Sequence, residues 1–155
     1  MSAHEIPHFT DSIFYSIKQI SRYLEIQGKE FFSSINDTLT PEEYITIDVI
    51  LCNDDICQRD LAKLILKDRV RTKRILDSLH KKGIIKFYSD IKNNRLVKKM
   101  EITKYGQEQF CDVTEKIQPY LNEMCVRFTD SQVSDLKNLL SLLQDALAST
   151  AKLQI

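Results

Sequence analysis

The sequence predicts a mainly α-helical fold with one small β-hairpin. Only three glycines and three prolines occur among the 155 residues, a composition that favours helices over a glycine-rich β architecture. Apolar residues recur at helical spacing towards both ends of the chain, and a short segment past the middle is rich in strand-forming residues. This length suits one hydrophobic core, so we expect a single domain over residues 1–155.

The N-terminal helix is predicted from an apolar stripe. Successive members lie four, four, three and four residues apart, which places them on one face of a helix over residues 10–27. We expect Thr10 or Asp11 to cap this helix and Gly28 to interrupt it. The stripe consists of Phe9, Ile13, Ile17, Ile20 and Leu24.

A second helix is predicted to begin at Pro41. Thr40 is a suitable N-cap, proline is favoured at the first helical position, and Glu43 completes a capping box. The polar residues 53–55 are expected to end this helix.

Two short helices follow with a tight turn between them. The first covers residues 57–66, and Asp68 is the expected N-cap of the second. Gly83 stands where a left-handed C-terminal cap is expected. The buried face of the second helix is predicted to contain Ile75, Leu76 and Leu79. This arrangement is a helix-turn-helix.

A β-hairpin and two long helices complete the predicted fold. The strands are residues 84–88 and 96–102, joined by the polar tip Lys92-Asn93-Asn94-Arg95. Thr103 is expected to cap a helix reaching the 120s, which Pro119 should kink or split. Asp130 or Ser131 should open the last helix. Its apolar side contains Val133, Leu136, Leu140, Leu143 and Leu147.

Charge is distributed very unevenly along the chain. The whole chain has a formal net charge of zero, yet residues 59–104 hold 15 of the 22 Lys and Arg and only 5 of the 22 Asp and Glu. That segment therefore has a net charge of +10 and the remainder −10. A concentrated positive segment attracts polyanions, so nucleic acid is the expected partner.

Other classes of protein find little support in the sequence. There is no glycine-rich phosphate loop and no metalloprotease or serine hydrolase motif, so we expect neither an enzyme nor a cofactor. The four cysteines lack zinc-site spacing, and we expect no metal. No apolar run approaches the roughly 18 residues of a membrane span and no signal peptide is evident, which predicts a cytoplasmic protein without a membrane partner.

Several short motifs stand in a fixed order between Leu39 and Gly106. They are Leu39-Thr40-Pro41, Leu61-Ala62, Arg74 to Leu79 with Lys82 to Ile85, Asp90 to Arg95, and Ile102-Thr103 with Gly106. In these motifs the run from Leu39 to Gly106 resembles the MarR family of bacterial transcription regulators. In the family the hairpin reads roughly Asp-x-x-Asp-Arg-Arg before its second strand. Here Asn93 and Asn94 replace the middle Asp-Arg, which removes one charge pair and one arginine.

The resemblance implies a winged helix-turn-helix regulator that binds double-stranded DNA. It implies a DNA-binding region over residues 39–103 and helical dimerisation segments over residues 10–36 and 104–155. A homodimer, expected to act as a repressor, would meet a pseudopalindromic operator with half-sites roughly 10 bp apart. Small apolar molecules control many members of the family, so a small-molecule effector is a further expectation.

Within that region, two elements supply the expected DNA contacts. They are the second helix of the helix-turn-helix, called the recognition helix, and the β-hairpin, called the wing. On the helix, Arg69 and Thr72 are expected to read bases, Arg71 and Lys73 to read bases or bind phosphates, and Arg74 to bind phosphate or serve the structure. On the wing, Arg95 is expected in the minor groove, braced by Asp90. Further wing contacts are assigned to Lys92, Asn93, Asn94, Lys98 and Lys99; Lys98 and Lys99 have an equally good alternative role in discouraging strand pairing at the hairpin edge.

Two alternative functions remain open at this point. A winged-helix module can bind proteins instead of DNA, although the +10 segment argues against it. A regulator can also respond to oxidants, and Cys111 or Cys125 would then be the sensor. Peroxide sensors of the family carry their cysteine in the first helix, where this chain has none. We expect Cys111 and Cys125 to lie on a buried stripe as unreactive thiols.

Overall fold

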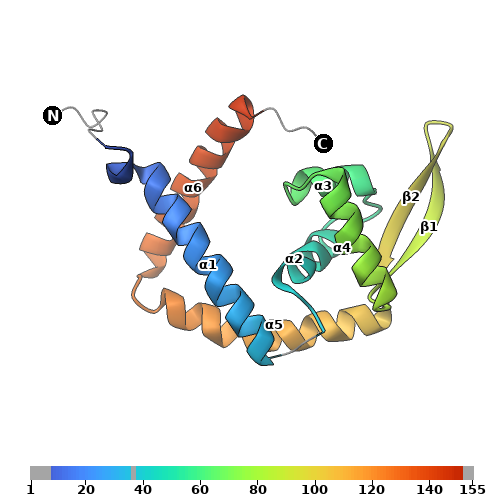
Figure 1. The fold of residues 1–155 in the computed structure, drawn as a ribbon, viewed down its shortest axis with the longest axis horizontal. Coiled ribbons are helices and arrows are strands. Elements are labelled where there is room, and N and C mark those ends of the chain that lie inside the picture. Colours follow the sequence, from blue (N-terminus) through green and yellow to red (C-terminus); the bar gives the residue numbers. More distant parts are fainter. Residues whose placement is uncertain (1–7, 36–37, 152–155) are drawn as a thin grey trace. The chain divides into compact units, whose positions relative to one another are not determined.

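The computed structural model describes residues 8–35 and 38–151. Within those ranges it contains six α-helices, a short 3-10 helix and a two-stranded antiparallel sheet (Figure 1). The predicted fold class is confirmed. The chain divides into two compact units, Met1–Pro41 and Glu42–Ile155, which are described separately below.

The first unit is a long helix. After the 3-10 turn Phe9–Asp11, α1 runs from Ile13 to Ile35. The cap is Ser12, whose hydroxyl accepts the Tyr15 backbone N–H at 3.2 Å, so the prediction of Thr10 or Asp11 was wrong. Gly28 does not interrupt the helix either, because a single glycine costs only about 1 kcal/mol against alanine.

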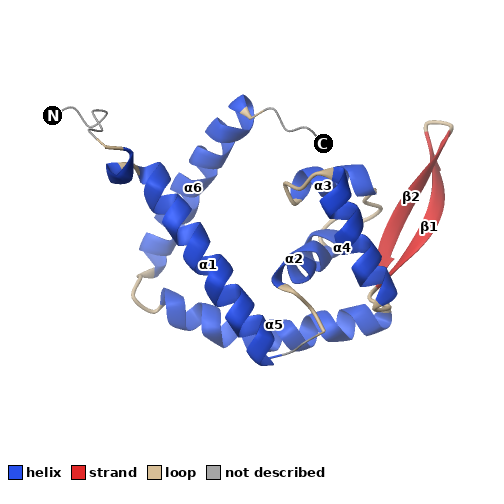
Figure 2. Ribbon diagram, in the orientation of Figure 1, coloured by secondary structure: helices blue, strands red, loops and turns tan. Residues whose placement is uncertain are grey.

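The second unit begins with the predicted helix-turn-helix and hairpin. Its elements are α2 (Pro41–Leu51), α3 (Gln58–Leu64), α4 (Arg69–Lys81), β1 (Ile85–Lys92) and β2 (Arg95–Ile102) (Figure 2). α3 packs on α4, and α4 contacts β1. Cys57, just before α3, adds a bridge to Lys99 of β2. The fully buried side chains of this unit include Ile47, Leu61, Leu76, Leu79, Ile84, Ile85 and Val113.

The junction between hairpin and α5 explains the Thr-x-x-Gly motif. Gly83 ends α4 with the expected left-handed backbone, φ 73°. The Thr103 hydroxyl accepts the Gly106 N–H at 3.0 Å and donates to the Gly83 carbonyl at 2.7 Å, so one side chain caps α5 and ties it to the end of α4. Gly106 lies against the Ile84 carbonyl, where a Cβ atom does not fit.

Two long helices complete the unit. α5 runs unbroken from Lys104 to Cys125 with Pro119 inside it. The alternative that Pro119 splits this helix is therefore wrong. Pro119 and Glu115 are exposed, which leaves water free to bind the carbonyl that the missing N–H would have met. α6 runs from Asp130 to Thr150, and Thr129 caps it in place of the predicted Asp130 or Ser131.

Candidate nucleic-acid interface

The helix α4, which the sequence predicts to be the recognition helix, begins at a well-defined cap. The Asp68 carboxylate accepts the backbone N–H of Arg71 at 2.8 Å, as the sequence predicted. Four basic side chains therefore fall within the first two turns of a helix whose start is fixed. They are Arg69, Arg71, Lys73 and Arg74.

The buried face of α4 determines which of the predicted residues can reach DNA. That face contains Thr72, Ile75, Leu76 and Leu79. Thr72 is fully buried, and its hydroxyl donates to the Asp68 carbonyl at 2.8 Å. A side chain enclosed by the core cannot meet a base edge, so the assignment of Thr72 to base reading is wrong. The spacing Thr72-Ile75-Leu76-Leu79 carries the signal that was missed, because it is one continuous helical stripe.

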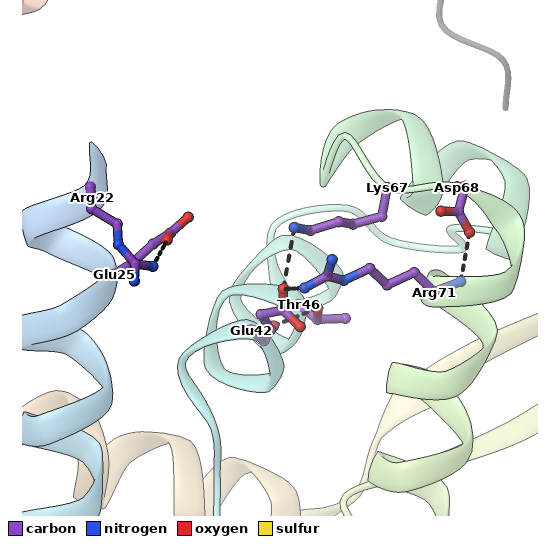
Figure 3. A network of polar contacts seen from close by, with 7 residues as sticks. All are labelled: Arg22, Glu25, Glu42, Thr46, Lys67, Asp68 and Arg71. Carbon is purple, nitrogen blue, oxygen red and sulfur yellow. Dashed lines mark hydrogen bonds and ion pairs between the residues drawn. The ribbon is translucent and has the colours of Figure 1, made fainter. Parts of the chain in front are cut away.

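Arg71 belongs to a polar network that joins α4 to α2. Its guanidinium donates to Glu42 at 2.6 Å, and the Lys67 ammonium lies 3.2 Å from the same oxygen (Figure 3). Partial burial raises the pKa of Glu42, but hydrogen bonds from Lys67 and Arg71 outweigh it and hold that pKa below its usual value. Arg71 is thus partly neutralised within the chain.

The other basic side chains of α4 differ in how they are paired. Lys73 lies 3.4 Å from Asp77, one turn along the exposed surface of the helix. Arg69 and Arg74 are exposed and have no acidic partner within the described part of the chain. These two side chains are available to bind an anion without first breaking an ion pair.

A buried carboxylate on α2 fixes the orientation of α4. Glu43 is 4% exposed and accepts hydrogen bonds from Ser78 at 2.6 Å and from the Lys82 ammonium at 2.7 and 2.9 Å. Ser78 and Lys82 lie one turn apart on the α4 side of this contact. Sequence periodicity does not reveal such a link, because its partners are 35 and 39 residues apart.

The tip of the wing is a two-residue turn. Asn93 and Asn94 both adopt left-handed backbone, with φ of 52° and 57°, the pattern of a type I′ turn that matches the twist of a hairpin. Asparagine tolerates this region better than most residues. Lys92 and Arg95 are paired across the strands at the base of the turn, and the Arg95 side chain is exposed.

The prediction that Asp90 braces Arg95 is wrong. Asp90 pairs with Lys99 instead. The Lys99 ammonium donates to Asp90 at 2.5 Å and lies 3.6 Å from Asp55, which also accepts the Tyr88 hydroxyl at 2.8 Å. The hydrogen bond from Lys99 holds the pKa of Asp90 below its usual value, and the same bond raises the pKa of Lys99. Lys99 is 7% exposed and held by these carboxylates, so of its two expected roles the phosphate contact is wrong.

Lys98 remains on the outer surface of the wing. Its ammonium lies 3.8 Å from the centre of the Phe87 ring, a cation–π contact that leaves the charge exposed to solvent.

The fold has many counterparts among solved structures. No family model matches the chain, and no curated protein matches its sequence. A complex of S. aureus MepR with DNA matches with a TM-score of 0.76 and 18% identity, over 90% of this chain and 99% of that one. The transcriptional regulator SlyA matches with a TM-score of 0.76 and 22% identity, over 90% and 96%. A MarR protein from Peptoclostridium difficile matches with a TM-score of 0.78 and 17% identity, over 97% of both chains.

This chain has the MarR-type winged-helix fold. The resemblance seen in the sequence is thereby confirmed at the level of three-dimensional structure. In this MarR-type fold, the motif residues Ser78, Lys82, Thr103 and Gly106 have the structural roles described above.

The cysteines of this chain do not lie where expected. Cys111 and Cys125 are both exposed, so their assignment to a buried stripe is wrong for the single chain. The reason is that α5 fully buries only Gly106 and Val113, both in its first half, so Cys111 and Cys125 lie outside its buried face.

The described residues contain no group of three or more His, Cys, Asp or Glu side chains placed to hold a metal ion. Among them, no helix combines the length and the apolar character needed to cross a membrane.

Proposed function

We propose that this chain is a sequence-specific double-stranded DNA-binding transcription regulator, a repressor that acts as a homodimer on a pseudopalindromic operator. The observation that carries the proposal is the outward face of α4, where Arg69 and Arg74 carry positive charge without an acidic partner in the described part of the chain. Recognition helices use such donors at their N-terminal turns to reach bases and phosphates in the major groove.

The ion pairs of the second unit support this assignment. The cations deeper in the fold are matched by carboxylates: Lys82 by Glu43 and Lys99 by Asp90. On α4, Lys73 pairs with Asp77, whereas Arg69 and Arg74 have no acidic partner within the described residues. Arg95 at the wing tip has none there either. A protein that binds DNA needs this distribution, because DNA phosphates supply the missing negative charge.

The solved structures add support at the level of fold. MepR, whose structure was determined in complex with DNA, shares the fold over nearly its whole length. The helix and wing of our proposal are elements that winged helix-turn-helix proteins use against the major and minor grooves.

The homodimer is inferred from apolar surface at both ends of the chain. α6 has no buried residue over its 21 positions, and exposed leucines run along it. They are Leu136, Leu139, Leu140, Leu142 and Leu147. α1 buries only Phe32 among its 23 residues and exposes a stripe that includes Ile13 and Ile20. Apolar surface of this extent is stabilised by burial against a second copy, which would also supply the second recognition helix.

The proposal is tested by DNA binding as a function of salt. Duplexes enriched from a random pool by the wild-type protein should bind with an affinity that falls steeply as salt rises, with a slope of about −0.9 per phosphate contact. Arg69→Ala should cost roughly 1–3 kcal/mol on the enriched duplex and less on random duplex, because a base contact is lost.

Lys116→Ala is the matched control. It removes one positive charge from α5, where Lys116 pairs with Asp112 at 2.6 Å. Its affinity for the enriched duplex and for random duplex should equal that of the wild-type protein. A flat salt dependence, or no enrichment from the pool, contradicts the proposal. An equal loss for Arg69→Ala on both duplexes would assign Arg69 to phosphate binding instead.

A further inference from the structure

One apolar residue stands in the middle of the proposed reading face. Val70, the second residue of α4, is 62% exposed. At about 100° per residue it lies roughly opposite the buried stripe centred on Thr72 and Leu79, so it points outward more directly than any neighbour in the first turn. Its exposed neighbours on this side of the helix are Arg69, Lys73 and Arg74.

Local structure gives no reason for a valine here. β-branched residues are weaker helix formers than alanine because their χ1 rotation is restricted in a helix. The cap of α4 is Asp68, and the face of the helix that packs on the core lies on its other side. An apolar side chain ringed by three cations is therefore suited to a partner that is polyanionic and offers an apolar group at its centre.

The major groove of DNA fits this description. Its edges carry hydrogen-bond donors and acceptors, and its apolar feature is the C5-methyl group of thymine. We propose that Val70 is a specificity-determining residue that packs on a thymine methyl in each half-site while the surrounding cations bind phosphates and neighbouring bases. This inference rests on the proposed function, because it requires α4 to enter the major groove.

The test removes the methyl group without changing base pairing. Duplexes enriched by the wild-type protein from a random pool are resynthesised with each thymine replaced in turn by deoxyuridine. One position per half-site should lose about fourfold in affinity, the factor that corresponds to ~0.8 kcal/mol for one buried methyl-sized group. With Val70→Ala, replacement at that position should have no further effect.

Two more variants separate this contact from general effects. Val70→Thr keeps a branched methyl group at the same place and should keep most of the sensitivity to deoxyuridine. Ile45→Ala, at an apolar position of similar exposure (56%) on α2, should keep all of it. Alanine is the stronger helix former, so Val70→Ala is expected to fold, and an unchanged circular dichroism spectrum checks this.

The outcomes distinguish this inference from the function on which it rests. If duplexes are enriched but no thymine shows a methyl effect, or the effect persists unchanged in Val70→Ala, the inference is wrong and the DNA-binding function stands. If no duplex is enriched, both fail together.

Discussion

Gly106→Ala offers a quantitative test of the junction between hairpin and α5. A Cβ atom on Gly106 would lie 2.9 Å from the Ile102 Cγ2 atom and 3.1 Å from the Ile84 carbonyl carbon, and closer still to the carbonyl oxygen. That oxygen accepts the Thr103 backbone N–H at 2.9 Å and lies 3.1 Å from the Thr103 hydroxyl, so it cannot move away without losing these contacts.

The expected cost follows from two opposing effects. Overpacking in a closed site costs about 1–3 kcal/mol, and more when the opposing atom belongs to the backbone. Alanine recovers at most about 1 kcal/mol through its higher helix propensity. We therefore expect Gly106→Ala to lower the free energy of unfolding by about 1–2 kcal/mol, or roughly 0.5–1 M in the urea midpoint for a slope near 2 kcal/mol/M.

Gly28→Ala is the matched control for this prediction. The same substitution in α1 would bring the new Cβ no closer than 3.9 Å to Pro41 Cγ, an ordinary contact. It should raise the free energy of unfolding by about 0.5–1 kcal/mol. Both variants are compared with wild type by urea titration at one protein concentration. A neutral or stabilising Gly106→Ala refutes the reasoning from steric contact.

Three further predictions concern the apolar ends, the clamp that buried Glu43 forms with Ser78 and Lys82, and the wing. Leu140→Asp should convert a dimer into a monomer in sedimentation, and a wild type that sediments as a monomer at micromolar concentration would exclude the dimer. Glu43→Ala should lower the free energy of unfolding by about 2 kcal/mol, since Lys82 and Ser78 lose their partner. If urea titration shows a change below about 0.5 kcal/mol, the clamp does not stabilise the fold. Asp90 has a folded pKa below its ordinary value of 3.8, so its ion pair with Lys99 stabilises the fold above that pH and is lost as pH falls through the lowered pKa. The difference in urea midpoint between wild type and Asp90→Asn should accordingly be constant from pH 5 to 8 and close below pH 3.8, and a difference that persists in acid would argue against the pair.

Local signals in the sequence predicted much of the fold. Pro41, Asp68, Gly83 and Thr103 mark helix ends through their own side chains or backbone preferences, so neighbouring residues suffice to place them. Thr129 was missed because Asp130 and Ser131 are equally good caps by residue type, and only the reciprocal bond with Gln132 distinguishes it.

The candidate site was predicted less completely, because residue type alone does not fix burial or pairing. Thr72 is polar by type, yet it satisfies its hydroxyl within its own helix and can be buried at little cost. The partner of Asp90 depended on the strand register: Asp90 and Lys99 share one face of the hairpin, as does Arg95, and the sequence does not state which cation turns inward. The contacts of Glu42 and Glu43 with α4 join residues far apart in the chain, beyond the reach of periodicity.

The clamp between Glu43 and α4 constrains how the proposed regulator can be switched. With Ser78 and Lys82 both held by one enclosed carboxylate, the recognition helix cannot roll about its own axis relative to α2 without breaking three hydrogen bonds. We call α2, α3, α4 and the hairpin of one chain a reading head, and its α2 and α4 then move together as a rigid body. An event elsewhere in the molecule can change the separation or tilt of two heads, and with it their fit to the spacing of an operator. It cannot readily change which bases a single head prefers, so affinity and base preference should vary independently of each other.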